Sequence, residues 1–112
     1  MKLDARDLDG ATVVSIGDSR LDAARSPEFR NALNGLLEAG KTRIVLDLEG
    51  VRFMDSSGLG VLVAVLKRLG RGGAIVLCGL GEGVRSLFEL TRMDLVFAIE
   101  PDVPAALLRL PE

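Results

Sequence analysis

The residues best suited to chemistry lie in one short stretch, Phe53-Met54-Asp55-Ser56-Ser57-Gly58-Leu59-Gly60. It places a carboxylate and two hydroxyls between an apolar strand, expected over residues 44–48, and an apolar helix, expected over residues 59–69. These residue types cap helices and permit tight turns. The hydroxyls would lie near the positive end of the helix dipole, which favours anions such as phosphate. The stretch therefore predicts a helix cap, a modification site, or both.

A serine at such a helix start could accept a phosphate. Phosphorylation adds roughly −1.5 to −2 charges at neutral pH. The helix dipole would tolerate this charge, so the fold would persist while its exposed surface changes. A modification here would therefore be read by a partner rather than unfold the domain.

Two glycine patterns suggest a nucleotide-binding loop, Gly79-x-Gly81-x-Gly83 and Gly58-x-Gly60. Neither completes G-x-G-x-x-G, and the chain contains no G-x-x-x-x-G-K-[ST] sequence. We therefore interpret these glycines as tight corners between strands and helices, and we predict no cofactor.

Serine catalysis and metal binding are also disfavoured. The chain has no histidine, which removes the usual general base and most zinc sites, and no glycine stands two residues before either serine. A lysine could replace the base, but all three are expected away from the site: Lys2, Lys41 and Lys67. Four acids could converge on a hard cation, although their spacing is not diagnostic: Asp18, Asp22, Asp55 and Glu82. We expect a protein that is not an enzyme.

Composition narrows the class of partner. The 112 residues fit one domain, 1–112, and 48% hydrophobic residues suffice for a core. A net charge of −2 and the absence of Trp and Tyr argue against nucleic acid and against an anionic membrane surface. The charged start is unlike a signal peptide, and Cys78 lies in an apolar strand where a small core residue is expected. A cytoplasmic location is expected.

Strands and helices are expected to alternate after an initial hairpin at Asp9-Gly10. Ser26 is expected to cap the first helix, which Gly40 would end. The third helix would bury Val84, Leu87, Phe88 and Leu90, and the last would begin at Pro101. The expected strands cover residues 2–9, 11–16, 43–48, 74–78 and 95–99.

This alternation implies right-handed crossovers and a mostly parallel sheet. Loops that follow the carboxyl ends of parallel strands gather at one edge, where sites tend to form. Three loops qualify: 17–26, 49–57 and 79–83. Asp22, Ser56 and the glycine loop are therefore expected to share one rim.

The chain resembles the bacterial anti-sigma factor antagonists, which are stand-alone STAS domains. Val51 to Val61, with its Asp-Ser-Ser-Gly-Leu-Gly core, is similar to their signature. Leu21-Asp22-Ala23 is similar to a Leu-Asp turn of the family, residues 44–48 to its central strand, and residues 84–91 to its third helix. The resemblance implies an α/β fold of STAS type, with a mixed, mostly parallel sheet of four to five strands and about four helices.

The resemblance also implies a partner switch. The unmodified antagonist would bind an anti-sigma factor that is a serine kinase with a histidine-kinase-like ATPase fold, and would thereby free the sigma factor. Phosphorylation of the first motif serine, here Ser56, would end binding, and a metal-dependent serine phosphatase would restore it. The implied partner-binding residues are Asp22, Asp55, Ser56, Ser57, Gly58, Leu59, Gly81 and Glu82. The alternative is an accessory STAS subunit of a stress-sensing or transport complex, with Ser56 serving only as a cap.

Overall fold

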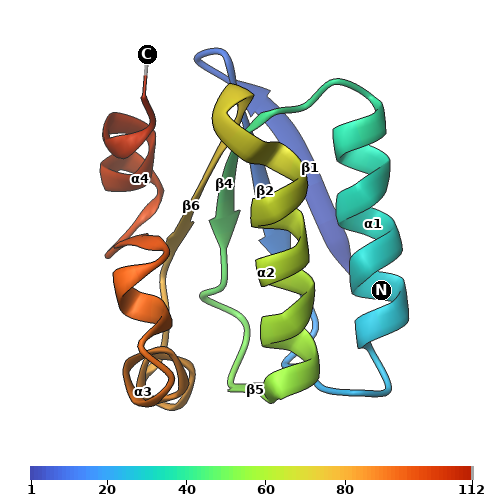
Figure 1. Ribbon diagram of the computed structural model, residues 1–112, viewed down its shortest axis with the longest axis vertical. Helices are drawn as coiled ribbons and strands as arrows, with labels where there is room; N and C mark the ends of the chain where they lie inside the picture. Colours follow the sequence, from blue (N-terminus) through green and yellow to red (C-terminus); the bar gives the residue numbers. More distant parts are fainter. Residues whose placement is uncertain (112) are drawn as a thin grey trace.

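The protein folds around a five-stranded sheet, as a computed structural model of the chain shows for residues 1–111 (Figure 1). The strand order is β1-β2-β4-β6-β7, and a separate two-stranded sheet pairs β3 with β5. The strands are β1 (Leu3–Leu8), β2 (Ala11–Ile16), β3 (Arg20–Leu21), β4 (Arg43–Asp47), β5 (Phe53–Met54), β6 (Ala74–Cys78) and β7 (Ala98–Glu100). The helices are α1 (Ser26–Glu38), α2 (Ser56–Leu69), α3 (Glu82–Leu90) and α4 (Val103–Arg109), with 3-10 turns at Gly70–Gly72 and Met93–Leu95.

The pairing of the large sheet is mixed, with one antiparallel pair and three parallel pairs. β1 and β2 form the antiparallel hairpin predicted from Asp9-Gly10, and both turn residues have positive φ, 53° and 77°. A turn with two positive φ angles matches the right-handed twist of the flanking strands. The remaining neighbours in the sheet are parallel. The predicted α/β fold with a mostly parallel sheet is therefore confirmed.

Helices cover both faces of the sheet. α1 and α2 lie side by side on one face, and α4 lies on the other (Figure 1). Alternation along the central strands sends Val14 and Leu46 into the core beneath α1 and α2, while Val13 and Val45 face α4. α2 contributes six buried residues against three from α1, which confirms that it is the more buried of the two.

The first helix begins differently from the prediction. Ser26 is not an N-cap: it lies within the first helical turn, and Arg25 occupies the cap position without a side-chain cap bond. The chain already turns at Asp22, whose carbonyl oxygen accepts from the Arg25 and Ser26 amides and from the Ser26 hydroxyl at 2.8 Å. Because this turn precedes the helix, Ser26 is buried and donates its hydroxyl inward.

The sequence pattern places Leu90 on the buried face of the third helix, and this prediction is wrong. Val84 and Phe88 are fully buried, but Leu90 is 84% exposed. Residues 84 and 88 lie one helical turn apart on the same face, whereas residue 90 is rotated about 200° from residue 88.

The last strand and the last helix also begin later than predicted. The expected strand at residues 95–99 starts at Ala98, because a 3-10 turn leaves Leu95 75% exposed. Phe97 is the buried residue of this segment, and its ring packs edge-on against Phe88 at a centroid distance of 5.8 Å. The final helix starts at Val103 rather than Pro101, because the Asp102 carboxylate caps it by accepting from the Ala105 amide at 2.9 Å.

Cys78 lies in the core, as predicted. Its side chain is fully buried under α4, and burial raises the pKa of its thiol to about 12. The structure therefore gives this residue a packing role.

Candidate functional site

The two-stranded sheet joins the loops that follow β2 and β4. Leu21 pairs with Met54, and the Asp55 amide donates to the Leu21 carbonyl oxygen at 3.3 Å. Leu21 and Met54 are buried beneath this small sheet, whereas Arg20 and Phe53 point outward. The sheet thus places Asp22 and Asp55 next to each other at one end of the molecule, as the rim prediction required.

α2 begins at Ser56, three residues earlier than predicted, because Asp55 caps it. Asp55 has extended backbone geometry, and one of its carboxylate oxygens accepts from the Ser57 amide at 2.8 Å and the Gly58 amide at 3.3 Å. A carboxylate in this position satisfies helix donors that would otherwise lack a partner, and it complements the helix dipole. The cap is therefore the acid rather than either serine.

Ser56 and Ser57 differ in their surroundings. Ser56 is exposed at the first helical position, and its hydroxyl makes no hydrogen bond to any other residue within 1–111. Ser57 is partly buried, and its amide is occupied by the Asp55 cap. Of the two hydroxyls, that of Ser56 is the more accessible.

Gly58 sets how closely α2 approaches β3. A Cβ atom at this position would lie 2.5 Å from the Leu21 carbonyl oxygen and 3.0 Å from Met54 Cγ. Gly58 and Leu59 are both buried, so these two predicted partner-binding residues lie beneath the surface and support its shape. Gly60, by contrast, is exposed and has open space around it.

Asp22 is engaged within the protein. One oxygen accepts from Arg20 Nε at 3.2 Å, and the other accepts from the Arg25 amide at 3.2 Å. The hydrogen bond from Arg20 holds the pKa of the Asp22 carboxyl below its ordinary value. The Arg20 guanidinium also stacks on the exposed Phe53 ring, 4.2 Å from its centroid. The sequence prediction missed this pair, for which residue types alone give no signal.

A shallow depression adjoins this cluster and is lined in part by Lys2, Asp18 and Arg25. The prediction that Lys2 lies away from the site is wrong. Its backbone amide donates to the Asp18 carboxylate at 2.7 Å, and this hydrogen bond holds the start of the chain against the rim. Arg25 also pairs with Asp18, at 3.5 Å.

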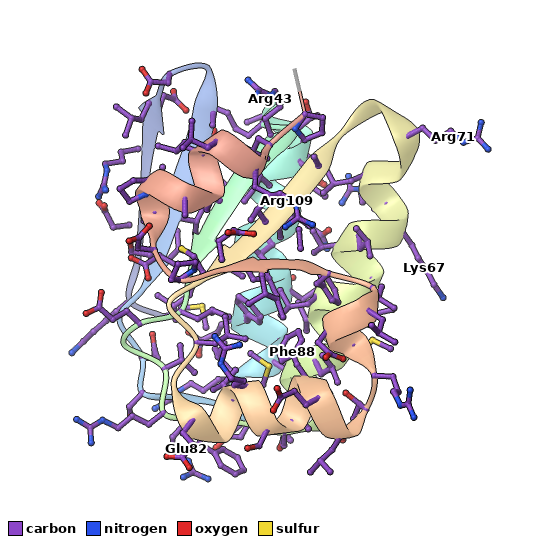
Figure 2. All side chains as sticks on the ribbon, turned by 90° about the vertical axis from the view of Figure 1, so that its left-hand side faces the viewer. Arg43, Lys67, Arg71, Glu82, Phe88 and Arg109 are labelled. Carbon is purple, nitrogen blue, oxygen red and sulfur yellow. The ribbon has the colours of Figure 1, made fainter. Side chains whose placement is uncertain are left out.

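The third loop closes the same end of the molecule. α3 begins at Glu82, with Gly81 in the cap position, and both residues are exposed. A Cβ atom on Gly83 would lie 3.3 Å from the Arg52 carbonyl oxygen, so this loop packs against the segment leading into β5. Figure 2 shows Glu82 at the end of the molecule, where α3 lies across the base of the sheet.

The acids of the rim do not form a metal centre. Within residues 1–111, no three His, Cys, Asp or Glu side chains come together in a way that could hold a metal ion. Asp18, Asp22 and Asp55 are instead engaged separately, by a salt bridge, by Arg20 and by helix amides. Over the same described residues, no helix has the length and apolar character needed to cross a bilayer.

The fold and its rim define an α/β domain whose accessible serine begins a buried helix. The STAS domain family model matches residues 2–106, and the chain belongs to this family. It is 34% identical over 79 residues to the anti-sigma-B factor antagonist of Staphylococcus aureus, covering 70% of this chain and 72% of that protein. The family assignment from the sequence is thus confirmed.

Solved structures agree with this assignment. The anti-sigma factor antagonist from Mycobacterium paratuberculosis superimposes with a TM-score of 0.90 at 27% identity, covering 99% of this chain and 94% of that one. Unphosphorylated SpoIIAA, an anti-sigma factor antagonist, gives a TM-score of 0.70 at 18% identity over 96% of this chain and 94% of its own. The phosphorylated form of SpoIIAA, from Bacillus, gives 0.68 at 20% identity over 93% and 96%. At these low identities, the similarity to the two SpoIIAA structures shows a shared fold only.

Proposed function

We propose that this protein is an anti-sigma factor antagonist that acts by partner switching. Its unphosphorylated form binds an anti-sigma factor that is a serine kinase, and binding releases the sigma factor. Phosphorylation of Ser56 ends binding, and a metal-dependent serine phosphatase restores it. The protein performs no catalysis itself, and ATP and Mg²⁺ belong to the kinase.

One observation carries the choice of Ser56. Because Asp55 caps α2, the cap needs neither serine hydroxyl, and the Ser56 hydroxyl is the exposed one of the two and is available to a kinase. Ser57 is partly buried, which makes it the poorer substrate. The position also suits the product, since a phosphate at the first helical residue lies at the positive end of the helix dipole.

The phosphate would act on the surface and leave the fold in place. It adds roughly −1.5 to −2 charges next to the carboxylate of Asp55. A partner surface matched to the unmodified rim would then have to bury a concentrated negative charge for which it has no counter-charge, and this weakens binding. SpoIIAA shares this fold and is known in both phosphorylated and unphosphorylated forms, which supports a switch that preserves the structure.

The contact surface proposed around Ser56 consists of its exposed and partly exposed neighbours on the rim. Asp55, Ser57, Gly81 and Glu82 contribute from the starts of α2 and α3. Asp22 contributes by holding Arg20 against Phe53, which presents a cation and an aromatic ring together. Arginine and aromatic residues often dominate binding energy at interfaces. Gly58 and Leu59 support this surface from within.

Co-purification with two forms of Ser56 provides the first test. Ser56→Ala adds no charge to the rim and should retain the kinase, whereas Ser56→Asp mimics the phosphate and should lose it. Ser57→Ala is the matched control: it removes a hydroxyl from the same surface but adds no charge, so it should weaken kinase binding far less than Ser56→Asp does. Capture of a large assembly by both Ser56 variants would favour the accessory-subunit alternative instead.

The retained protein then provides the second test. Purified partner and ATP are incubated with the wild type, and the phosphate is located by mass spectrometry. We expect phosphate on Ser56 in the wild type and in Ser57→Ala, and none in Ser56→Ala. Phosphate elsewhere, or undiminished binding by Ser56→Asp, would refute the proposal.

A further inference from the structure

β1 is the outermost strand of the large sheet, and no described strand pairs with its outer edge (Figure 2, blue, at the left margin). The Gly17 amide donates to the Lys2 carbonyl oxygen at 2.7 Å, so Lys2 and Gly17 form a hydrogen-bonded pair. In an antiparallel ladder such pairs alternate with non-hydrogen-bonded pairs. With the observed register, Asp4 and Arg6 therefore bond inward to β2, while Leu3, Ala5 and Asp7 direct their amides and carbonyls outward.

These outward groups restrict how a second strand could pair with the edge. An antiparallel copy of β1 must place residues 3, 5 and 7 opposite one another, because only these residues offer backbone donors and acceptors. A two-fold axis at Ala5 satisfies this condition and pairs Leu3 with Asp7 of the second copy, and Ala5 with its own equivalent. In this register Asp4 lies directly opposite Arg6 of the second copy, and the pair occurs twice.

Neighbouring symmetric registers lack this complementarity. A shift of the axis to Arg6 would place two arginines opposite each other, and a shift to Asp4 would place two aspartates together. Like charges directly opposite are unfavourable, whereas opposite charges stabilise a cross-strand pair. Within one chain Asp4 and Arg6 form a long ion pair, with Arg6 Nη1 3.9 Å from an Asp4 carboxylate oxygen. Both side chains are exposed, at 73% for Asp4 and 55% for Arg6, so they can exchange this contact for pairs with a second copy.

We propose that the β1 edge is a self-association surface on which a second copy of this chain adds its own β1. The pairing is antiparallel, is centred on Ala5, and is selected by two reciprocal Asp4–Arg6 pairs. It joins two five-stranded sheets into one continuous sheet. Unpaired edge strands are templates for this kind of pairing unless their charges oppose it, and here the charges favour one register.

The geometry of this dimer keeps both rims accessible. The two-fold axis runs perpendicular to the sheet and reverses the strand direction, so the two Ser56 rims point to opposite ends of the assembly. Six residues per strand form a small contact, below the area of a standard stable interface. The association is therefore weak and depends on protein concentration. Ser56→Asp should leave this self-association unchanged. A negative result for self-association would therefore not contradict the partner switch, and the reverse also holds.

Sedimentation equilibrium from micromolar to millimolar concentrations tests the proposal. The wild-type mass should rise from 11.9 kDa towards twice that value. Ala5→Pro should remain at the single-chain mass, because proline removes the central outward amide and fills the edge. This amide makes no bond to β2, and proline is tolerated at such edge positions, so circular dichroism should show a retained fold. If the wild-type protein remains monomeric at all concentrations, the proposal is overturned.

Charge reversal provides a second test, which does not depend on proline. Asp4→Arg alone and Arg6→Asp alone each create two like-charge pairs, so neither variant should self-associate. A mixture of the two variants restores both opposite-charge pairs, and the Asp4→Arg/Arg6→Asp double variant restores them within one chain. Both should associate as the wild type does. Lys67→Asp matches the charge change of Arg6→Asp at an exposed site on α2 and should have no effect (Figure 2). Association that is insensitive to these reversals would refute the register.

Discussion

Replacement of Gly58 by alanine tests whether the first turn of α2 is held against β3 by close backbone contact. The added Cβ would lie 2.5 Å from the Leu21 carbonyl oxygen, whereas an ordinary contact is roughly 3.5 Å, so the two backbones would have to separate by about 1 Å. That shift would weaken the hydrogen bond from the Asp55 amide to the same oxygen, already at 3.3 Å. Overpacking of this kind costs about 1–3 kcal/mol.

Thermal unfolding followed by circular dichroism measures this cost. For a domain of this length, each 1 kcal/mol lowers the Tm by about 4 °C, so a cost of about 2 kcal/mol gives a decrease of about 8 °C. Gly60→Ala is the matched control in the same helix, since nothing lies within 4 Å of its added Cβ. Alanine is the better helix former by about 0.5–1 kcal/mol, so Gly60→Ala should raise the Tm by a few degrees. If Gly58→Ala melts at or above the wild-type temperature, close approach does not limit this position.

Three further predictions concern single groups. Asp55→Ala removes the cap of α2 and should lower the free energy of unfolding by about 1 kcal/mol in urea titrations, while Asp55→Asn, which can still accept, should lose less; equal losses would contradict the capping role. The hydrogen bond from Arg20 holds the pKa of Asp22 below its ordinary value, so their contact stabilises the protein at neutral pH, and this contribution is lost as the pH falls through the lowered pKa. The difference in unfolding free energy between the wild type and Arg20→Gln should therefore shrink in acid, and a difference that grows would be inconsistent with this pairing. Buried Cys78, with its pKa raised to about 12, should react with a thiol reagent only as fast as the protein unfolds, so rapid labelling of the native protein would disprove its burial.

The regular part of the fold could be predicted because sequence pattern and tertiary environment agree there. The strands Ala11–Ile16 and Ala74–Cys78 were placed at their observed bounds, since β-branched or apolar runs end at glycine in both. The hairpin followed from Asp9-Gly10, a pair that accepts positive φ. Pattern reasoning failed where a competing local interaction was stronger, as at Ser26, where the turn at Asp22 had already started the helix.

The site was predictable in location but not in construction. β3 and β5 have two residues each, which is too short to show the alternation of apolar and polar residues that marks a strand. The pairing of Leu21 with Met54 therefore could not be predicted from the sequence. Without that pairing, nothing in the sequence showed why Gly58 must be small. The resemblance selected Ser56 over Ser57. The physical reason for that choice, the exposure of Ser56 beside a partly buried Ser57, required the three-dimensional structure.

Four consecutive residues at the start of α2 have separate tasks. Asp55 satisfies the helix donors, Ser57 supplies one of those donors, and Gly58 allows contact with β3. Ser56 takes part in none of these contacts among the described residues. A change confined to its hydroxyl therefore alters the charge of the rim while its neighbours continue to hold the helix. This separation is what a phosphorylation switch requires, because the modified and unmodified proteins must both remain folded and differ only in the surface that a partner meets.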